Sequence, residues 1–217
     1  MIETQRVVVV GASGFGRECL DVLDAMIADG GPVEIAGVVD DGPSAVNLDR
    51  LAARGVVFLG SAAEWLTDDA DDVRYVLGIG SPDVRRRLVA LADASGRRAF
   101  TAVHPTATLG AMTSLGDGVV VCAGACISTN VRLGRHVHIN PNVTLGHDSI
   151  LEDFVSINPA ATISGEVVIG EGSLVGTTAT VLQNLSVGAN TVVGAAALVT
   201  KDVPAGVIVK GVPGAWA

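Results

Sequence analysis

Residues 127–151 read ISTNVRLGRHVHINPNVTLGHDSIL, with an aliphatic residue at every sixth position. The spacing continues in both directions, and the complete column is Val103, Leu109, Leu115, Val121, Ile127, Leu133, Ile139, Leu145, Leu151, Ile157, Ile163, Ile169, Val175, Val181, Val187, Val193 and Val199. A helix has a period of 3.6 residues and a simple strand a period of two, so neither explains this repeat. A strict six-residue period is typical of a parallel β-helix, in which each short strand forms one face of a triangular coil.

The residues around each aliphatic anchor support this interpretation. The residue four places later is nearly always small or β-branched, as at Ala125 and Val131, and a glycine often follows the anchor, as at Gly134 and Gly146. We therefore expect the anchors to point inward and the glycines to turn the corners. Three hexads complete one coil, so residues three hexads apart are expected to lie one above the other.

The first part of the chain follows a different pattern. The expected strands cover residues 6–10, 34–39, 56–59 and 74–79, and the expected helices cover residues 17–28 and 83–94, the second starting at Ser81-Pro82. Strands that alternate with helices predict a small parallel, Rossmann-like α/β sheet. We predict one domain over residues 1–98 and a β-helix domain over residues 99–217, with the proline-containing tail packed outside the last coil.

Composition excludes several classes of function. The 217 residues carry a formal charge of −9, which argues against a nucleic-acid partner because such partners need a basic surface. The uncharged stretch 173–200 is long enough to span a bilayer, but the six-residue period runs through it and predicts coil rather than membrane insertion. Three cysteines and no secretory leader predict a reduced, cytoplasmic protein.

A glycine-rich loop, Gly11-Ala-Ser-Gly14-Phe-Gly16, connects the first expected strand to the first expected helix. Such a loop lets the backbone approach a phosphate at the helix N-terminus, and Asp40, after the second strand, could accept hydrogen bonds from a ribose or base. The alternative is a tight turn that binds nothing. A nicotinamide-dependent oxidoreductase is disfavoured because the segment is half of a full dinucleotide fold and the only tyrosine, Tyr75, has no lysine four residues later. A mononucleotide or nucleotide-sugar fits better.

His147 follows a glycine at a predicted coil corner, and Asp148 stands beside it. A neutral histidine oriented by a carboxylate is the usual general base near neutral pH. Gly165 follows one full coil later, so we expect it to leave open space beside the ring and to aim its amide at a developing oxyanion. His136 and His138 form a His-x-His pair that would suit a zinc hydratase, but such a site needs three well-placed ligands, so no metal is expected.

Several motifs occur together in a specific order: the loop 11–18, Val39-Asp40-Asp41, the segment 78–81, Gly146-His147-Asp148 and the closing segment 210–213. In that order the chain resembles, from Val7 to about Gly214, the sialic acid O-acetyltransferase type of two-domain sugar acyltransferases. This family includes the bacterial UDP-4-amino-sugar N-acetyltransferases. The resemblance implies a left-handed coil and a homotrimer with active sites between neighbouring subunits.

The resemblance further implies an acetyl-CoA-dependent N-acetyltransferase that acts on a nucleotide-linked amino sugar for bacterial surface glycans. His147 would act as general base with support from Asp148, without a covalent acyl-enzyme. O-acetylation of a free sugar acid such as sialic acid is the alternative within the same class. A non-catalytic scaffold is a further alternative, and its role would not depend on His147.

The positions that match the family's binding residues fall into two groups. The nucleotide-sugar would contact Gly11, Ser13, Gly14, Phe15, Gly16, Asp40, Asp41, Gly80 and Ser81. Acetyl-CoA would lie along the groove between coils and contact Ser156, Gly165, Thr177, Ala195 and Lys210. Two departures stand out. Ser156 replaces a second histidine found in some relatives, and the end of the chain lacks a cation after Val212-Pro213, so Lys201 or Lys210 would have to meet the CoA phosphates.

Overall fold

The computed structural model describes residues 4–68 and 72–216, and the chain divides into two compact units, residues 1–102 and 103–217. In the first unit, the described strands form a parallel sheet in the order β3-β2-β1-β4. The strands are β1 (Gln5–Val10), β2 (Val33–Val39), β3 (Phe58–Gly60) and β4 (Arg74–Leu77), and the helices are α1 (Gly14–Ala28), α2 (Ala45–Ala53), α3 (Ala62–Thr67) and α4 (Pro82–Ala94).

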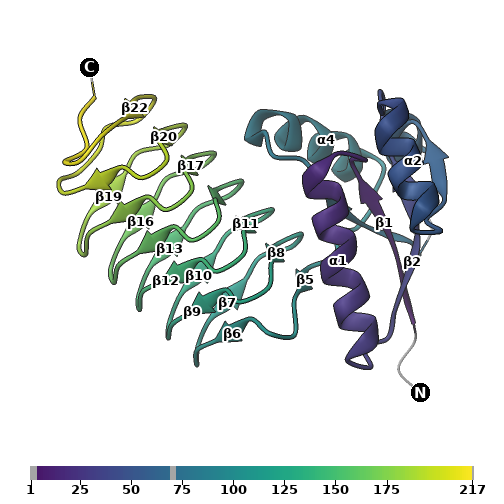
Figure 1. Ribbon diagram of the computed structural model, residues 1–217, viewed down its shortest axis with the longest axis horizontal. Helices are drawn as coiled ribbons and strands as arrows, with labels where there is room; N and C mark the ends of the chain where they lie inside the picture. Colours follow the sequence, from purple (N-terminus) through teal and green to yellow (C-terminus); the bar gives the residue numbers. More distant parts are fainter. Residues whose placement is uncertain (1–3, 69–71, 217) are drawn as a thin grey trace. The chain divides into compact units, whose positions relative to one another are not determined.

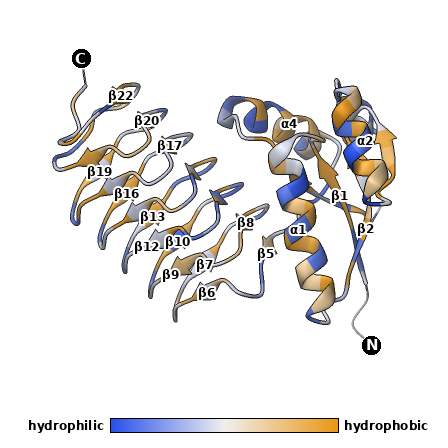
Figure 2. Cartoon of the chain, in the orientation of Figure 1, coloured by the Kyte–Doolittle hydropathy of each residue, from blue (hydrophilic) through white to orange (hydrophobic). Residues whose placement is uncertain are grey.

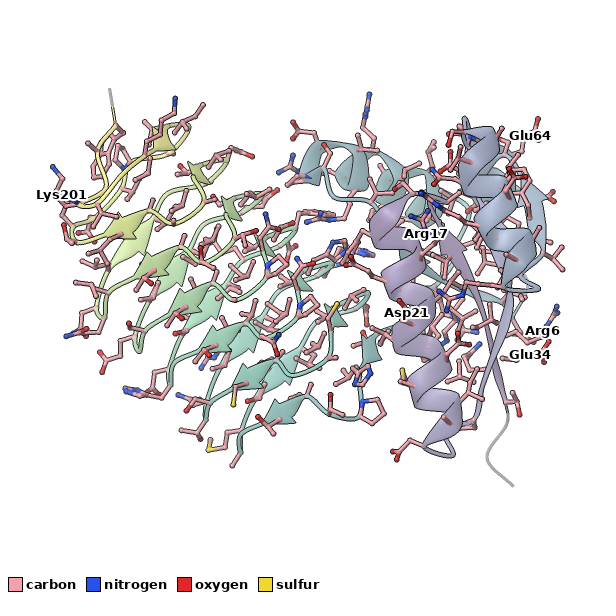
Figure 3. All side chains as sticks on the ribbon, viewed as in Figure 1. Arg6, Arg17, Asp21, Glu34, Glu64 and Lys201 are labelled. Atoms are coloured by element: carbon pink, nitrogen blue, oxygen red, sulfur yellow. The ribbon has the colours of Figure 1, made fainter. Side chains whose placement is uncertain are left out.

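The central strand β1 explains why this unit folds as a covered sheet. Its last four residues, 7–10, are all valine and all buried, which is typical of a parallel strand with both faces covered. Helix α1 buries one stripe that includes Cys19, Leu20 and Leu23, and Figure 2 shows hydrophobic and hydrophilic residues alternating along this helix. At the exposed start of the sheet, Arg6 and Glu34 pair at 3.6 Å across β1 and β2 (Figure 3).

The expected strands and helices of this unit are confirmed, with shifted ends. The strand predicted at 56–59 begins only at Phe58, because the Val56 amide donates to the carbonyl of Leu51 and closes the turn after α2. The sequence interpretation missed α2 and α3. Both begin at a serine whose hydroxyl accepts a backbone N–H three residues on, Ser44 from Asn47 and Ser61 from Glu64.

The second unit is a parallel β-helix of the left-handed hexapeptide type, as predicted. Figure 1 shows its coils rising from β5 to β22. Its two-residue strands are β5 (Ala102–Val103), β6 (Thr108–Leu109), β7 (Ser114–Leu115), β8 (Val120–Val121), β9 (Cys126–Ile127), β10 (Arg132–Leu133), β11 (His138–Ile139), β12 (Thr144–Leu145), β13 (Ile150–Leu151), β14 (Ser156–Ile157), β15 (Thr162–Ile163), β16 (Val168–Ile169), β17 (Leu174–Val175), β18 (Thr180–Val181), β19 (Ser186–Val187), β20 (Val192–Val193), β21 (Leu198–Val199) and β22 (Ile208–Val209).

Residues three hexads apart lie side by side in these sheets, as Leu133, Leu151 and Ile169 do in successive coils. The anchors from Val121 to Val199 are buried and form one hydrophobic core with the small residues four places later. Leu109 departs from the expected pattern and is 40% exposed, because it lies in the first coil, where the stack of aliphatic side chains ends.

The glycines after the anchors do not turn the corners by adopting a left-handed conformation. The left-handed residue is usually three places after the anchor, as at Asn130 and Asp148, with φ of 57° and 61°. The glycine is needed instead because successive coils touch there. A Cβ on Gly170 would lie 2.5 Å from the backbone nitrogen of Ala189 in the next coil.

The end of the chain also differs from expectation. Instead of packing outside the coil, β22 pairs in parallel with β20 and extends its sheet, and Val209 joins the core. The uncharged stretch 173–200 lies in the strands β17 to β21 of the coil. In the part of the chain that the structure describes, no helix combines the length and hydropathy needed to cross a membrane.

The aliphatic core predicts a graded loss of stability on truncation. Ile169 is fully buried, so Ile169→Ala should lower the free energy of unfolding by about 2–5 kcal/mol and Ile169→Val by about 0.5–1.5 kcal/mol. Leu109→Ala should cost less than Ile169→Ala, because Leu109 is already 40% exposed. Denaturant unfolding of the three variants measures this order, and equal losses at both alanine sites would contradict the core described here.

Candidate active site

The glycine-rich loop joins β1 to α1 through contacts that admit no side chain. Gly11 has φ of +114°, and a Cβ on it would lie 2.8 Å from the carbonyl oxygen of Gly78. A Cβ on Gly16 would overlap the carbonyl of Gly11, and one on Gly78 would overlap Gly16. These three glycines therefore pack the loop against the end of β4. Gly14 differs, because a Cβ there would meet no atom within 4 Å.

The N-terminus of α1 keeps the features expected of an anion site. Ser13 precedes the helix, is exposed, and makes no capping hydrogen bond with its side chain. The first turn, which contains Phe15, carries no acidic residue, so no carboxylate of that turn offsets the positive end of the helix dipole. Arg17 reaches back to donate to the carbonyl of Ala12 at 3.0 Å and to Asn47 at 2.7 Å, and Figure 3 shows it on this helix.

Asp40 and Asp41 are held by hydrogen bonds within the unit. Asp40 accepts the amides of Ala12 and Gly42, both at 2.8 Å, and so fastens the glycine-rich loop to the end of β2. Asp41 accepts from the Ser61 hydroxyl at 2.8 Å and from a backbone amide at the start of α3. The backbone hydrogen bond, with help from Ser61, lowers the pKa of Asp41. Both carboxylates shape the loops around the predicted nucleotide site.

Gly80 and Ser81 lie in the loop between β4 and α4. Ser81 caps α4 by accepting the amide of Val84, and a Cβ on Gly80 would meet no atom within 4 Å. The sequence interpretation overlooked Arg85, which is fully buried and donates to the carbonyls of Ile79 and Gly80 at 3.0 and 2.9 Å. Burial lowers the pKa of Arg85 to about 9. The sequence gives little indication of this buried role, because Arg85 begins a run of three arginines, a pattern typical of an exposed, charged helix face.

In the second unit, His147 and Asp148 form the corner after β12. His147 Nδ1 lies 2.7 Å from Asp148 Oδ2, and both side chains are exposed. One coil earlier, Asn130 donates its Nδ2 to the other oxygen of Asp148 at 2.6 Å. Asn130 and His147 both favour the carboxylate form, in that order of strength, and lower the pKa of Asp148. The pair is thus a histidine held by an ionised carboxylate, as a general base requires.

Gly165 lies next to the ring, as the coil repeat predicts, but it does not leave open space. A Cβ on Gly165 would lie 2.6 Å from both Nε2 and Cε1 of His147, so the imidazole itself occupies the space that the glycine vacates. Gly165 is therefore required for the position of the ring. Its role as an oxyanion donor stays a prediction.

The predicted acetyl-CoA positions are spread over different parts of the coil. Thr177 and Ala195 are exposed and occupy one corner of successive coils, while Gly165 belongs to the corner of His147. Ser156 is buried on β14, in register with His138 on β11. Lys210 is exposed, and its backbone pairs with Ala215. All five positions stay predictions.

The histidine pair considered for zinc is buried, and His136 stacks on Phe154 with ring centroids 5.6 Å apart. Within residues 4–68 and 72–216, one group has the donors and spacing to hold a metal ion: His147, Asp148 and Glu166, all exposed. Sequence analysis missed Glu166, although its position three hexads after Asp148 places it in the same corner of the next coil.

The packing of the glycine-rich loop predicts opposite outcomes for two alanine substitutions. Gly16→Ala forces a methyl group into the Gly11 carbonyl and should destabilise the first unit by about 1–3 kcal/mol. Gly14→Ala, at the first residue of α1 with free space around its Cβ, should leave stability unchanged or slightly higher. Hydrogen exchange of the α1 amides in the full chain measures both, and equal protection in the two variants would contradict this packing.

The hydrogen bonds to Asp148 predict its titration. Carbon-detected NMR should find the pKa of this carboxyl below its ordinary value of 3.8, and Asn130→Ala should raise it, because the Asn130 amide is the largest cause of the shift. These hydrogen bonds favour the charged form, so their stabilising effect is complete above the ordinary pKa and is lost as the pH falls through the lowered value. Asn184→Ala, two coils away at the same corner, is the control and should leave the titration unchanged.

Comparison with known proteins connects both units to one family. Residues 6–91 match the PglD N-terminal domain family. Over 149 residues, 68% of this chain, the sequence is 30% identical to GDP-perosamine N-acetyltransferase from Escherichia coli O157:H7. That match spans 64% of the relative's length, slightly less than two thirds.

Two solved structures extend the likeness over nearly the whole chain. PerB from Caulobacter crescentus, in complex with CoA and GDP-perosamine, is 29% identical with a TM-score of 0.82, over 97% of this chain and 96% of that one. The acetyltransferase domain of PglB from Neisseria gonorrhoeae FA1090, in complex with acetyl coenzyme A, is 28% identical with a TM-score of 0.83, over 99% of this chain and 100% of that one. Through its PglD-type first unit and its hexapeptide coil, the chain is therefore similar over nearly its whole length to bacterial sugar acetyltransferases with hexapeptide repeats.

Proposed function

We propose that this protein transfers the acetyl group of acetyl-CoA to the amino nitrogen of a nucleotide-linked amino sugar. The observation that carries the proposal is the exposed pair of His147 and Asp148, 2.7 Å apart, seated over a glycine at a coil corner. The names of the similar proteins support it, since they act on or bind GDP-perosamine and bind CoA. GDP-linked amino sugars are therefore the first acceptors to test.

The chemistry needs one base. The acceptor amine attacks the thioester carbonyl, a C–N bond forms, and the C–S bond breaks to release the thiolate of CoA. His147 takes the proton that the nitrogen loses and returns one to the departing sulfur, so that free CoA leaves as the thiol. Asp148, kept ionised by Asn130, holds the imidazole through Nδ1 and stabilises its protonated form during the step. Binding of both substrates beside His147 would lower the entropic cost of bringing the amine and the thioester together.

The first unit would hold the nucleotide-sugar. Its support is the anion-binding character of the N-terminus of α1, where exposed Ser13 and Gly14 precede a first turn without acidic residues. Asp40 and Arg85 fix the two loops on either side. The hydroxyl and amide groups of the glycine-rich loop and of the loop at Gly80 and Ser81 would then meet the diphosphate and sugar.

The second unit would hold acetyl-CoA along its coils, with Thr177 and Ala195 on the exposed corner. Ser156 would replace the second histidine of some relatives as a smaller hydrogen-bonding group. Lys210 is exposed and available for a phosphate, whereas the ammonium of Lys201 lies 4.8 Å from the ring centre of Trp216. A homotrimer in the cytoplasm, with sites completed by neighbouring subunits, forms part of the proposal. Exposed aliphatic residues such as Ile150 and Val168, adjacent on one sheet, support a surface that a second copy covers.

The decisive experiment measures thiol release from acetyl-CoA with GDP-perosamine, with UDP- and dTDP-linked amino sugars, and with free sialic acid. Wild type should turn over one nucleotide-linked amino sugar, and His147→Ala should lower kcat by about 10²–10⁴-fold, the usual contribution of a general base. His147→Asn, which keeps a polar side chain of similar width, is the matched variant and should lose as much.

Unchanged melting temperatures of both variants would show that the fold is intact. Turnover of sialic acid alone would move the assignment to O-acetylation. Full activity of a folded His147→Ala protein would remove the histidine from the mechanism.

A further inference from the structure

One corner of the coil carries a ladder of four polar side chains. Asn130, Asp148, Glu166 and Asn184 follow one another once per coil, each with φ between 57° and 61°. Each backbone amide donates to a carbonyl of the preceding coil, as Glu166 does to His147 at 2.8 Å. The backbone thus fixes an order of amide, carboxylate, carboxylate and amide along the edge where His147 lies.

Glu166 brings a second carboxylate to the histidine. One nitrogen of His147, one oxygen of Asp148 and one oxygen of Glu166 all lie within 4.8 Å of one another. Gly165, directly before Glu166, has no side chain, so the imidazole lies against its backbone and comes within reach of the next residue. The mechanism proposed above uses His147 and Asp148 and leaves Glu166 without a role.

The charges at this corner are unbalanced. Two carboxylates lie close together, and among the residues that the structure describes no lysine or arginine forms an ion pair with either of them. Like charges at this spacing repel, and the repulsion is relieved when a cation comes between them. The corner is therefore electrostatically suited to a positively charged group beside the imidazole.

The acceptor of the proposed reaction supplies such a group. An alkyl amine is largely an ammonium ion at neutral pH, whereas a sugar hydroxyl is neutral and a sugar acid is an anion. We propose that Glu166 binds the ammonium form of the acceptor and so selects an amino sugar over its hydroxyl counterpart. This inference rests on the proposed function and names the residue that determines its acceptor class.

The proton balance follows from this binding mode. The acceptor enters as R–NH3+ and gives one proton to solvent before it attacks. The neutral amine then forms the C–N bond while the C–S bond breaks, and His147 carries the second proton from nitrogen to sulfur. The net products are the acetamide, CoA as its thiol, and one proton released to water. Glu166 takes no proton in this sequence and acts by binding the cation before the proton leaves.

The test is Glu166→Gln, which keeps the shape of the side chain and removes its charge. With GDP-perosamine as acceptor, KM should rise about two- to fivefold, the range expected for loss of one exposed ion pair, while kcat stays within about threefold of wild type. The inhibition constant of the GDP-sugar with a hydroxyl in place of the amine should not change. Glu166→Asp should restore part of the preference for the amine.

Each other outcome has a definite meaning. Equal weakening of the amine and hydroxyl ligands by Glu166→Gln would make Glu166 a merely structural residue and overturn the inference, as would unchanged kinetics. Stoichiometric zinc in the purified protein, lost in Glu166→Gln, would assign the corner to a metal and also overturn it. If wild type acetylates no nucleotide-linked amino sugar, the proposed function fails instead, a result visible before any variant is made.

Discussion

The stacking of each coil on the one before it is the constraint on which the second unit depends. The aliphatic anchors make the core, and the same stacking brings together residues that are far apart in sequence. Asn130 reaches Asp148, and Gly165 meets the ring of His147, only because each pair is one coil apart. The corner proposed to be catalytic is therefore assembled from residues of three successive coils, with no inserted loop.

The first unit positions its candidate site residues in a different way. Its predicted binding loops are short. They are held by close backbone contacts among Gly11, Gly16 and Gly78, by the amides that donate to Asp40, and by the hydrogen bonds that Arg85 donates. The exposed positions, Ser13 and Gly14, lie on this rigid base. Loops held in this way can present amide groups to a ligand with little loss of conformational entropy on binding.

Most of the correct predictions for the second unit came from the periodicity of the sequence. The six-residue repeat predicted the coil and its core, and the offset of three hexads predicted that Gly165 lies beside His147. The predictions that were wrong for this unit concerned packing between coils. The role of the glycines after the anchors, the filled space at Gly165 and the pairing of β22 all follow from contacts that a linear pattern does not encode. Helices α2 and α3 were missed because they are short, although the spacing of Ser61 and Glu64 is a recognised helix start. Arg85 was overlooked because burial, not residue type, sets its role.

The vertical register of the coil has a consequence for which deletions the chain can tolerate. A deletion of one full coil directly after His147, positions 148–165, would leave every remaining aliphatic anchor in phase, so the shortened chain would still stack. The corner around His147 would not survive, because Gln183 would then occupy the place of Gly165 and its side chain would displace the imidazole. Removal of a whole coil is thus compatible with stacking, but it preserves the corner around His147 only when the coils that carry Asn130, His147 and Gly165 are all kept.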